Sequence, residues 1–427
     1  MLFLASMPAL IKVLLALALI LTLNRLKLHL GLSLFVGAVT LGLMMGLSPV
    51  KIGQGLVKSL TDSQSLSLIV IVTVILVLSR LMADIGQLDR MVESFSGLVH
   101  NVKVSSLVMP ALIGLLPMPG GALFSAPMVE AAFRGEKVSP EVKTVINYWF
   151  RHIWEYVWPL YPGYVLAVSL LGVPNWKFTL LQTPMTLIAT AAGMLFLWPI
   201  LPGAENESGG AGGRGRWQDF SRQVQPIALI VLAIPAVKLI ELASGLTLPG
   251  LTSVYLGLGL CLGWVIVQNR LKPRAVFSAL FHKAVFPMVV LVLGIMAFKG
   301  LLVESRAVEQ IQKEMAFWGI PPLLAVALMP FLSGMVTGIA VGFVGASFPL
   351  IVPLFPPGHG LDFMAYATLA FGFGYMGMML SPVHLCLIVT KDYFSASLLK
   401  SYRHLVGPAV IVLLAQLGLF SLFRMIG

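Results

Sequence analysis

Arg151 and Glu155 are the residues whose types and spacing suggest chemistry in this sequence. They stand four residues apart in a long apolar segment, so a helix would place both on one face, with Asn147 one turn earlier. An arginine at the centre of a membrane span costs about 2.5–3.5 kcal/mol and therefore faces protein or water and is paired. In one interpretation Arg151 binds an anionic substrate and Glu155 carries a coupling proton or cation. In the other, the two form an internal salt bridge, or Arg151 extends to the cytoplasmic interface.

Two histidines, His152 and His384, have neighbours in the sequence that suggest how each is used. His384 follows Pro382, so it could relay a proton or donate a hydrogen bond to a substrate. Alternatively, it only satisfies a backbone carbonyl that the proline leaves free. His152 is flanked by aromatic residues on another helical face than Arg151, and we expect it to be packed or at the membrane interface.

Other kinds of site find little support in the sequence. It contains no P-loop, no dinucleotide-binding fingerprint and no His-Glu-x-x-His zinc helix. The only two cysteines, Cys261 and Cys386, stand in separate apolar segments and imply neither a disulfide framework nor a metal site. We therefore expect no cofactor and no metal, and a function other than that of an enzyme.

The candidate residues named above must be positioned by segments in which a helix is interrupted. The first such segment is residues 110–127. The stretch is almost wholly apolar, yet its 18 residues include four prolines and three glycines, which rule out an uninterrupted helix. We predict a helical hairpin over residues 105–133 with its non-helical tip at 117–121. Irregular backbone at membrane depth is tolerated only where protein buries it or it lines a cavity. The open alternative is a single spanning helix with a proline kink.

Three further interruptions follow along the chain. A second apolar stretch with many glycines, residues 333–349, predicts another hairpin over 320–355. Each hairpin precedes a span that is itself broken, at residues 158–163 and at residues 380–384. Proline frees a backbone carbonyl that can coordinate a cation, and the N-terminus of a half-helix favours an anion. Breaks at matching places in two halves favour a binding site over isolated kinks.

These considerations select the candidate site residues, which belong to the two hairpin tips and the two breaks. Those expected to bind the substrate are Asn147, Arg151, Pro119, Gly120, Gly121, Ser125, Thr337, Gly338, Ser381 and His384. Those expected to hold the coupling ion are Glu155, Tyr161, Ser333 and Ser347.

Composition places the chain in a membrane. Of its 427 residues 58% are hydrophobic and 11% are charged, against about 25% charged in soluble domains. We predict an all-α polytopic membrane protein with spans near residues 8–23, 28–47, 66–83, 144–172, 176–201, 224–243, 248–268, 283–303, 363–390 and 404–425. The first segment lacks a basic start and is followed by Arg25 and Lys27, so we expect a retained helix with its N-terminus outside.

The order of spans and hairpins repeats in the two halves. We predict a first repeat over residues 1–203, a flexible polar linker over 204–222 and a second repeat over 223–427. If each hairpin is re-entrant, each half crosses five times and the repeats are inverted. This topology puts 18 lysines and arginines in cytoplasmic loops, 7 outside and 3 within spans. The bias follows the positive-inside rule, with the linker cytoplasmic and both termini outside. The net charge of +11 is thereby explained without nucleic acid.

The run Leu-Leu-Pro-Met-Pro-Gly-Gly-Ala-Leu-Phe-Ser-Ala-Pro-Met-Val-Glu130, followed by Asn147-Tyr-Trp-Phe-Arg-His-Ile-Trp-Glu-Tyr-Val-Trp-Pro159, resembles an uncharacterised family of bacterial and archaeal membrane proteins. That family is similar to the ion transporter superfamily, which includes gluconate, citrate–metal, arsenite and sodium–dicarboxylate permeases. The resemblance implies that tips and breaks bind a small anion and a coupling cation, and it implies a homodimer. The dicarboxylate branch carries Ser-Asn-Thr at its tips, whereas this chain has Pro-Met-Pro-Gly-Gly and Val-Thr-Gly-Ile, a departure that argues against dicarboxylates.

We therefore expect a secondary active transporter in the cytoplasmic (inner) cell membrane, coupled to H⁺ or Na⁺ and specific for a small anionic solute. A channel is the first alternative and would show fluxes that need no ion gradient. An intramembrane enzyme acting on a lipid-linked substrate is the second alternative. It would require clustered catalytic groups, and the sequence offers only Arg151, Glu155 and His384 for them.

Overall fold

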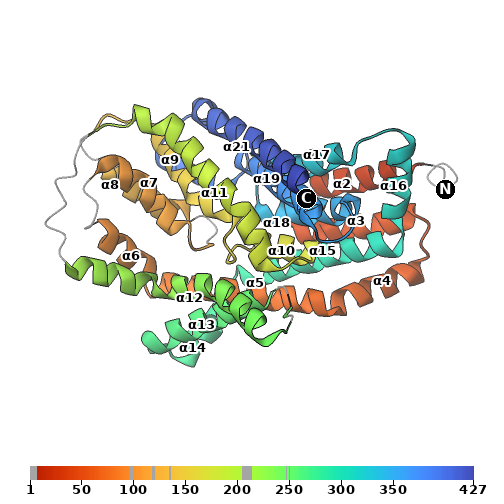
Figure 1. Cartoon of the computed structure of the whole chain (residues 1–427), viewed down its shortest axis with the longest axis horizontal. Coiled ribbons are helices and arrows are strands. Elements are labelled where there is room, and N and C mark those ends of the chain that lie inside the picture. Colours follow the sequence, from red (N-terminus) through yellow and green to blue (C-terminus); the bar gives the residue numbers. More distant parts are fainter. Residues whose placement is uncertain are drawn as a thin grey trace.

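The computed structural model describes residues 7–96, 101–117, 121–133, 136–203, 214–246, 248–249 and 251–427, and every element assigned in them is a helix (Figure 1). In the first half these are α2 (Ala9–Arg25), α3 (Leu30–Met44), α4 (Pro49–Thr61), α5 (Ser63–Asp84), α6 (Gln87–Ser96), α7 (Val102–Ile113), α8 (Ala122–Ala132), α9 (Pro140–His152), the 3₁₀ helix η1 (Ile153–Tyr156), α10 (Pro162–Leu171), α11 (Asn175–Leu197) and η2 (Trp198–Ile200).

The helices of the second half follow in a similar order. They are α12 (Arg214–Ser244), α13 (Thr252–Gln268), α14 (Pro273–Leu280), α15 (Val285–Glu304), α16 (Ala307–Phe317), α17 (Pro322–Thr337), α18 (Ala340–Ile351), η3 (Val352–Leu354), α19 (Leu361–Met379), α20 (Leu385–Tyr393) and α21 (Leu398–Ile426).

Several helices have the length and composition of membrane spans. In the described part of the chain, five are long and apolar enough to cross a membrane: Ser63–Asp84, Asn175–Ile200, Trp217–Ser244, Val285–Glu304 and Leu398–Ile426. Shorter apolar helices, such as Pro322–Thr337 and Ala340–Leu354, accompany them. The chain is thus an all-helical protein with the character of a membrane protein.

Both stretches predicted as hairpins are interrupted helices. The first consists of α7 and α8, which pack on each other; residues 118–120, the centre of the predicted tip, lie outside the described residues. In the second, α17 ends at Thr337 and α18 begins at Ala340. Gly338 between them has φ +65°, a conformation that favours glycine. The prediction that neither stretch forms one continuous helix is confirmed.

The two spans that follow the hairpins are broken at the predicted places. The first continues from α9 through η1 and resumes as α10 at Pro162. The second ends as α19 at Met379 and resumes as α20 at Leu385. Proline explains the first break, because Pro159 has no N–H to donate to the carbonyl of Glu155.

The structure adds short helices that the search for long apolar segments did not find. The segments left between the predicted spans and hairpins contain α4, α6, α14 and α16. These helices have 8 to 13 residues and are too short to cross a membrane. In addition, α12 begins at Arg214, so residues 214–222 of the predicted linker are helical, and residues 204–213 lie outside the described part.

Helices of the first half of the chain pack against helices of the second half. α3 and α4 pack on α15 of the second half, whereas α13 and α14 pack on α5 of the first. α16 packs on α2 and α6 on α12; α10 packs on α18 and α20 on α8. α11 and α21 lie side by side across the molecule (Figure 1). The interrupted helices therefore meet in the interior, between segments far apart in sequence.

Candidate binding site

A cavity of about 180 Å³ lies where the four interruptions meet. Side chains and backbone from both hairpins and both breaks line it, together with residues of α5, α15 and α19. Its lining consists of Leu76, Pro117, Arg151, His152, Glu155, Tyr161, Pro162, Gly163, Met288, Gly338, Ile339, Ala340, Val341, Met378, His384, Leu385 and Cys386.

The structure places the predicted site residues in three groups. Those that line the cavity are Arg151, Glu155, Tyr161, Gly338 and His384. Those that lie in the surrounding helices and turns are Asn147, Gly121, Ser125, Ser333, Thr337, Ser347 and Ser381. Pro119 and Gly120 lie outside the described residues.

Arg151 is buried at the centre of this arrangement and is only 2% exposed. A Cβ atom built on Gly121, the residue before α8, would lie 2.2 Å from Nη2 of Arg151, so the guanidinium lies directly on the backbone of the first hairpin. Nη1 of Arg151 donates to Sγ of Cys386 over 3.7 Å. The arginine thus connects the first hairpin with the start of α20.

Glu155 lies in the 3₁₀ turn η1 and not on α9, which ends at His152. The prediction of one continuous helical face for Arg151 and Glu155 is therefore wrong, because the helix tightens before Pro159. Glu155 is 7% exposed, and its Oε1 lies 3.8 Å from Nε2 of His152.

Three aromatic side chains satisfy carbonyls at the end of α7. Trp154 Nε1 donates to the carbonyl of Ala111 (2.9 Å) and Trp158 Nε1 to that of Leu115 (2.8 Å). The Tyr161 hydroxyl, which also lines the cavity, donates to the carbonyl of Gly114 (2.6 Å). The last carbonyls of a helix have no partner within it, so these donors hold the hairpin arm against the first break.

Further hydrogen bonds join the halves around the cavity. The Asn147 amide donates to the carbonyl of Ala122 (3.0 Å) and to Oγ1 of Thr390 (3.1 Å), so Asn147 ties the first hairpin to α20. The Tyr148 hydroxyl donates to the carbonyl of Met379 (3.0 Å), the last residue of α19. The Tyr375 hydroxyl donates to the carbonyl of His152.

Most of the hydroxyls selected from the sequence hydrogen-bond to backbone carbonyls. Ser347 donates to Phe343 (2.6 Å) and Thr337 to Ser333 (2.7 Å), each one helical turn earlier. Ser125 donates to Ala122 over 3.4 Å. Ser381 differs, since its hydroxyl reaches the carbonyl of Met335 in α17 (2.7 Å) and fixes the second break against the second hairpin.

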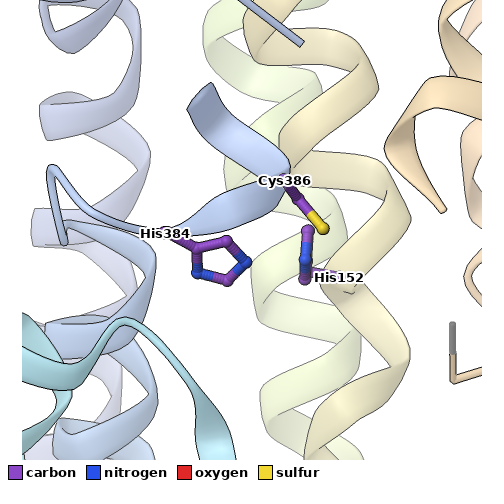
Figure 2. Close-up of side chains that lie close together, drawn as sticks. All are labelled: His152, His384 and Cys386. Atoms are coloured by element: carbon purple, nitrogen blue, oxygen red, sulfur yellow. The ribbon is translucent and has the colours of Figure 1, made fainter. Parts of the chain in front are cut away.

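His152, His384 and Cys386 form a cluster that the sequence did not reveal (Figure 2). One ligand atom of each lies within 4.8 Å of the others, and the two imidazole rings stand at 89° with centroids 4.9 Å apart. His152, expected to be packed or interfacial, thus forms part of the cavity wall. The spacing of His384 and Cys386 directly after Pro382 was the only local signal, and nothing in the sequence joined it to His152.

Comparison with known proteins assigns the sequence to a family. A family model with the description "Protein of unknown function (DUF401)" matches residues 7–422, nearly the whole chain. No curated protein matches the sequence.

Proposed function

For this chain, which belongs to the DUF401 family, we propose the function of a secondary active transporter of a small anionic solute, coupled to H⁺ or Na⁺ and working by alternating access. The observation that carries the proposal is the meeting of four helix interruptions around one cavity that contains a buried arginine and a buried carboxylate. Interrupted helices that meet in the interior are how secondary transporters expose backbone to solute and ion.

Alternating access between two repeats is supported by the order and the packing of the helices. In the described residues, α2 to α11 and α12 to α21 can be paired in order, with hairpins α7–α8 and α17–α18 and broken spans α9–α10 and α19–α20. Pairing them explains the exchanged packing, since α3 on α15 matches α13 on α5, and α16 on α2 matches α6 on α12. We infer repeats over residues 1–203 and 223–427.

One residue-level match supports the same alignment. A Cβ on Gly193 of α11 would lie 2.5 Å from Nε1 of Trp149, and a Cβ on Gly372 of α19 would lie 2.2 Å from Oε1 of Gln416. Trp149 and Gly372 are 223 positions apart, as are Gly193 and Gln416, and this is also the offset between Pro159 and Pro382. At equivalent places in the two halves, a large side chain therefore packs against a glycine of the neighbouring helix. In the first half the side chain comes from α9, and in the second half it comes from α21.

We further propose that the repeats are inverted in the cell membrane. Five crossings in each half, with both hairpins re-entrant, give ten spans, external termini and a cytoplasmic linker. This topology accounts for the excess of basic residues in the loops assigned to the cytoplasm. The hairpins would then enter from opposite sides, as in members of the ion transporter superfamily, which the sequence resembles.

Each cavity residue has a role in this proposal. Arg151 attracts the anion, while backbone at the hairpin tips and breaks gives the site its shape. Glu155 carries the coupling charge; its Oε1 faces Nε2 of His152 at 3.8 Å, and a proton between these two atoms would be shared by two acceptors. The volume of 180 Å³ is below that of sites for drug-sized ligands, which begin at about 300 Å³, so the solute is small.

Replacing Glu155 with glutamine is expected to abolish uptake driven by an ion gradient while exchange of solute across the membrane continues. The amide keeps the size of the carboxylate but can carry neither a transferable proton nor a charge to balance Na⁺.

Purified protein in proteoliposomes would be assayed with a panel of organic and inorganic anions under imposed H⁺ or Na⁺ gradients. Glu309→Gln on the exposed side of α16 is the matched control. Gradient-driven uptake equal to that of the wild type would contradict the role of Glu155. Large fluxes that need no gradient in the wild type would favour a channel.

The topology is tested by cysteine labelling from outside intact cells. With Cys261 and Cys386 replaced by serine, a cysteine at Gly360, in the exposed segment before α19, is expected to react with an impermeant maleimide. A cysteine at Gly209, in the predicted linker, is expected to react only after the membrane is permeabilised. Labelling of both positions from the same side would rule out inverted repeats.

A further inference from the structure

The cluster of His152, His384 and Cys386 offers three metal-ligating side chains in one buried place. Their exposed fractions are 1%, 6% and 6%, and they come from the end of α9 and the start of α20, more than 230 residues apart in sequence. Figure 2 shows the His384 ring and the Cys386 sulfur both directed toward His152. Imidazole nitrogen with thiolate sulfur is a donor set that suits copper and zinc.

The hydrogen bonds of both histidines leave the same ring nitrogen available as a ligand. Nδ1 of His152 lies 2.6 Å from the carbonyl of Tyr148, and Nδ1 of His384 lies 3.3 Å from that of Met378. A carbonyl only accepts, so Nδ1 carries the hydrogen in each ring and Nε2 carries a lone pair. A backbone carbonyl on the other ring nitrogen is the usual support of a metal-binding histidine.

The distances require a modest adjustment. Metal bonds of about 2.0–2.1 Å to nitrogen and 2.3 Å to sulfur place the ligand atoms about 3.5 Å apart. The present separations of up to 4.8 Å would have to close by about 1 Å. His384 and Cys386 stand at the N-terminal end of α20, directly after a break, where small rotations of the backbone do not disturb a helix.

The number and type of the ligands select the class of ion. Soft thiolate sulfur selects Cu(I) and zinc over harder ions. Structural zinc sites have four protein ligands, whereas the cluster found among the described residues offers three, one of them sulfur. Three ligands of this kind therefore favour a soft ion of the Cu(I) class.

We infer that His152, His384 and Cys386 form a binding site for a soft monovalent metal ion of the Cu(I) class. The inference goes beyond the proposed transport function and does not rest on it, because binding needs only the folded chain.

The test uses Ag(I), a redox-inert ion of this class, on the full-length protein purified in detergent without chloride. We expect one tightly bound Ag(I) per chain, measured by competition with a chelator. Cys386→Ser, His384→Gln and His152→Gln should each weaken binding by about 100-fold, at the upper end of the effects of removing groups that only support metal ligands. Cys261→Ser, which removes the other buried cysteine, and His359→Gln, which removes an exposed histidine, are controls expected to retain it.

X-ray absorption of the Ag(I)-loaded protein should show one sulfur and two nitrogen neighbours. Retention of wild-type affinity in monodisperse His384→Gln and His152→Gln protein would overturn the inference, since the thiol alone would then account for binding. Equal losses in Cys261→Ser and Cys386→Ser would overturn it as well. Displacement of Ag(I) by an equal concentration of Zn²⁺ would overturn the assignment to a monovalent ion. None of these results depends on transport, so they leave the uptake experiments to be judged separately.

Discussion

Replacing Arg151 with alanine is expected to lower solute uptake by at least about 30-fold, and by up to several thousand-fold. Removal of one partner from a buried, hydrogen-bonded charge interaction costs about 2–5 kcal/mol of binding, and each 1.4 kcal/mol is a factor of ten. Arg151 is 2% exposed and lines the cavity, so an anion bound there would meet its guanidinium away from bulk water. The initial rate of uptake in proteoliposomes, over a range of solute concentrations, measures the effect.

Two companion variants separate the role of the charge from that of folding. Arg151→Lys keeps a positive charge but lacks the planar guanidinium group that lies against Gly121. We therefore expect partial uptake that requires a higher solute concentration than uptake by the wild type. Arg424→Ala removes an exposed arginine that pairs with Asp362 (3.2 Å), and little change is expected. Wild-type uptake by Arg151→Ala would show that the arginine is only structural. Loss of monodispersity in that variant would be tested against Arg151→Lys.

Replacing Gly377 with alanine is expected to destabilise the protein by about 1–3 kcal/mol or more, the usual cost of overpacking a close contact. α17 and α19 pack backbone against backbone at this point. A Cβ on Gly377 would lie 2.0 Å from the carbonyl oxygen of Phe331, and a Cβ on Gly334 would lie 2.3 Å from that of Gly374. Backbone atoms cannot yield as a flexible side chain would, so the helices must separate.

Thermal unfolding in detergent, followed by circular dichroism, measures this loss. Gly259→Ala is the matched control, because Gly259 lies within α13 and a Cβ there would meet nothing within 4 Å. That substitution is expected to be neutral or stabilising by about 0.5–1 kcal/mol, since alanine favours a helix. Because Met378 lines the cavity next to Gly377, uptake should also fall. Equal melting temperatures for Gly377→Ala and Gly259→Ala would contradict the close contact.

The sequence by itself determined the helical class, the membrane character and the places where helices are interrupted. Proline lacks the amide hydrogen that a helix needs, so the break near Pro159 follows from local chemistry. Gly338 likewise stands where the backbone takes a positive φ between α17 and α18. The short helix α4 escaped prediction because a search for apolar segments long enough to cross a membrane does not detect a helix of 13 residues that contains two lysines.

Only the tertiary structure decided which side chains surround the cavity. Ser125 and Ser347 looked as suitable as any polar residue near a hairpin, yet they hydrogen-bond to carbonyls of their own helices. His152 and Cys386, which the sequence assigned to packing and to an isolated apolar segment, lie together in the cavity wall. Local sequence determines where backbone groups are freed. The packing of α9 against α20, two segments of different halves, determines which side chains meet there, and no short-range pattern encodes it.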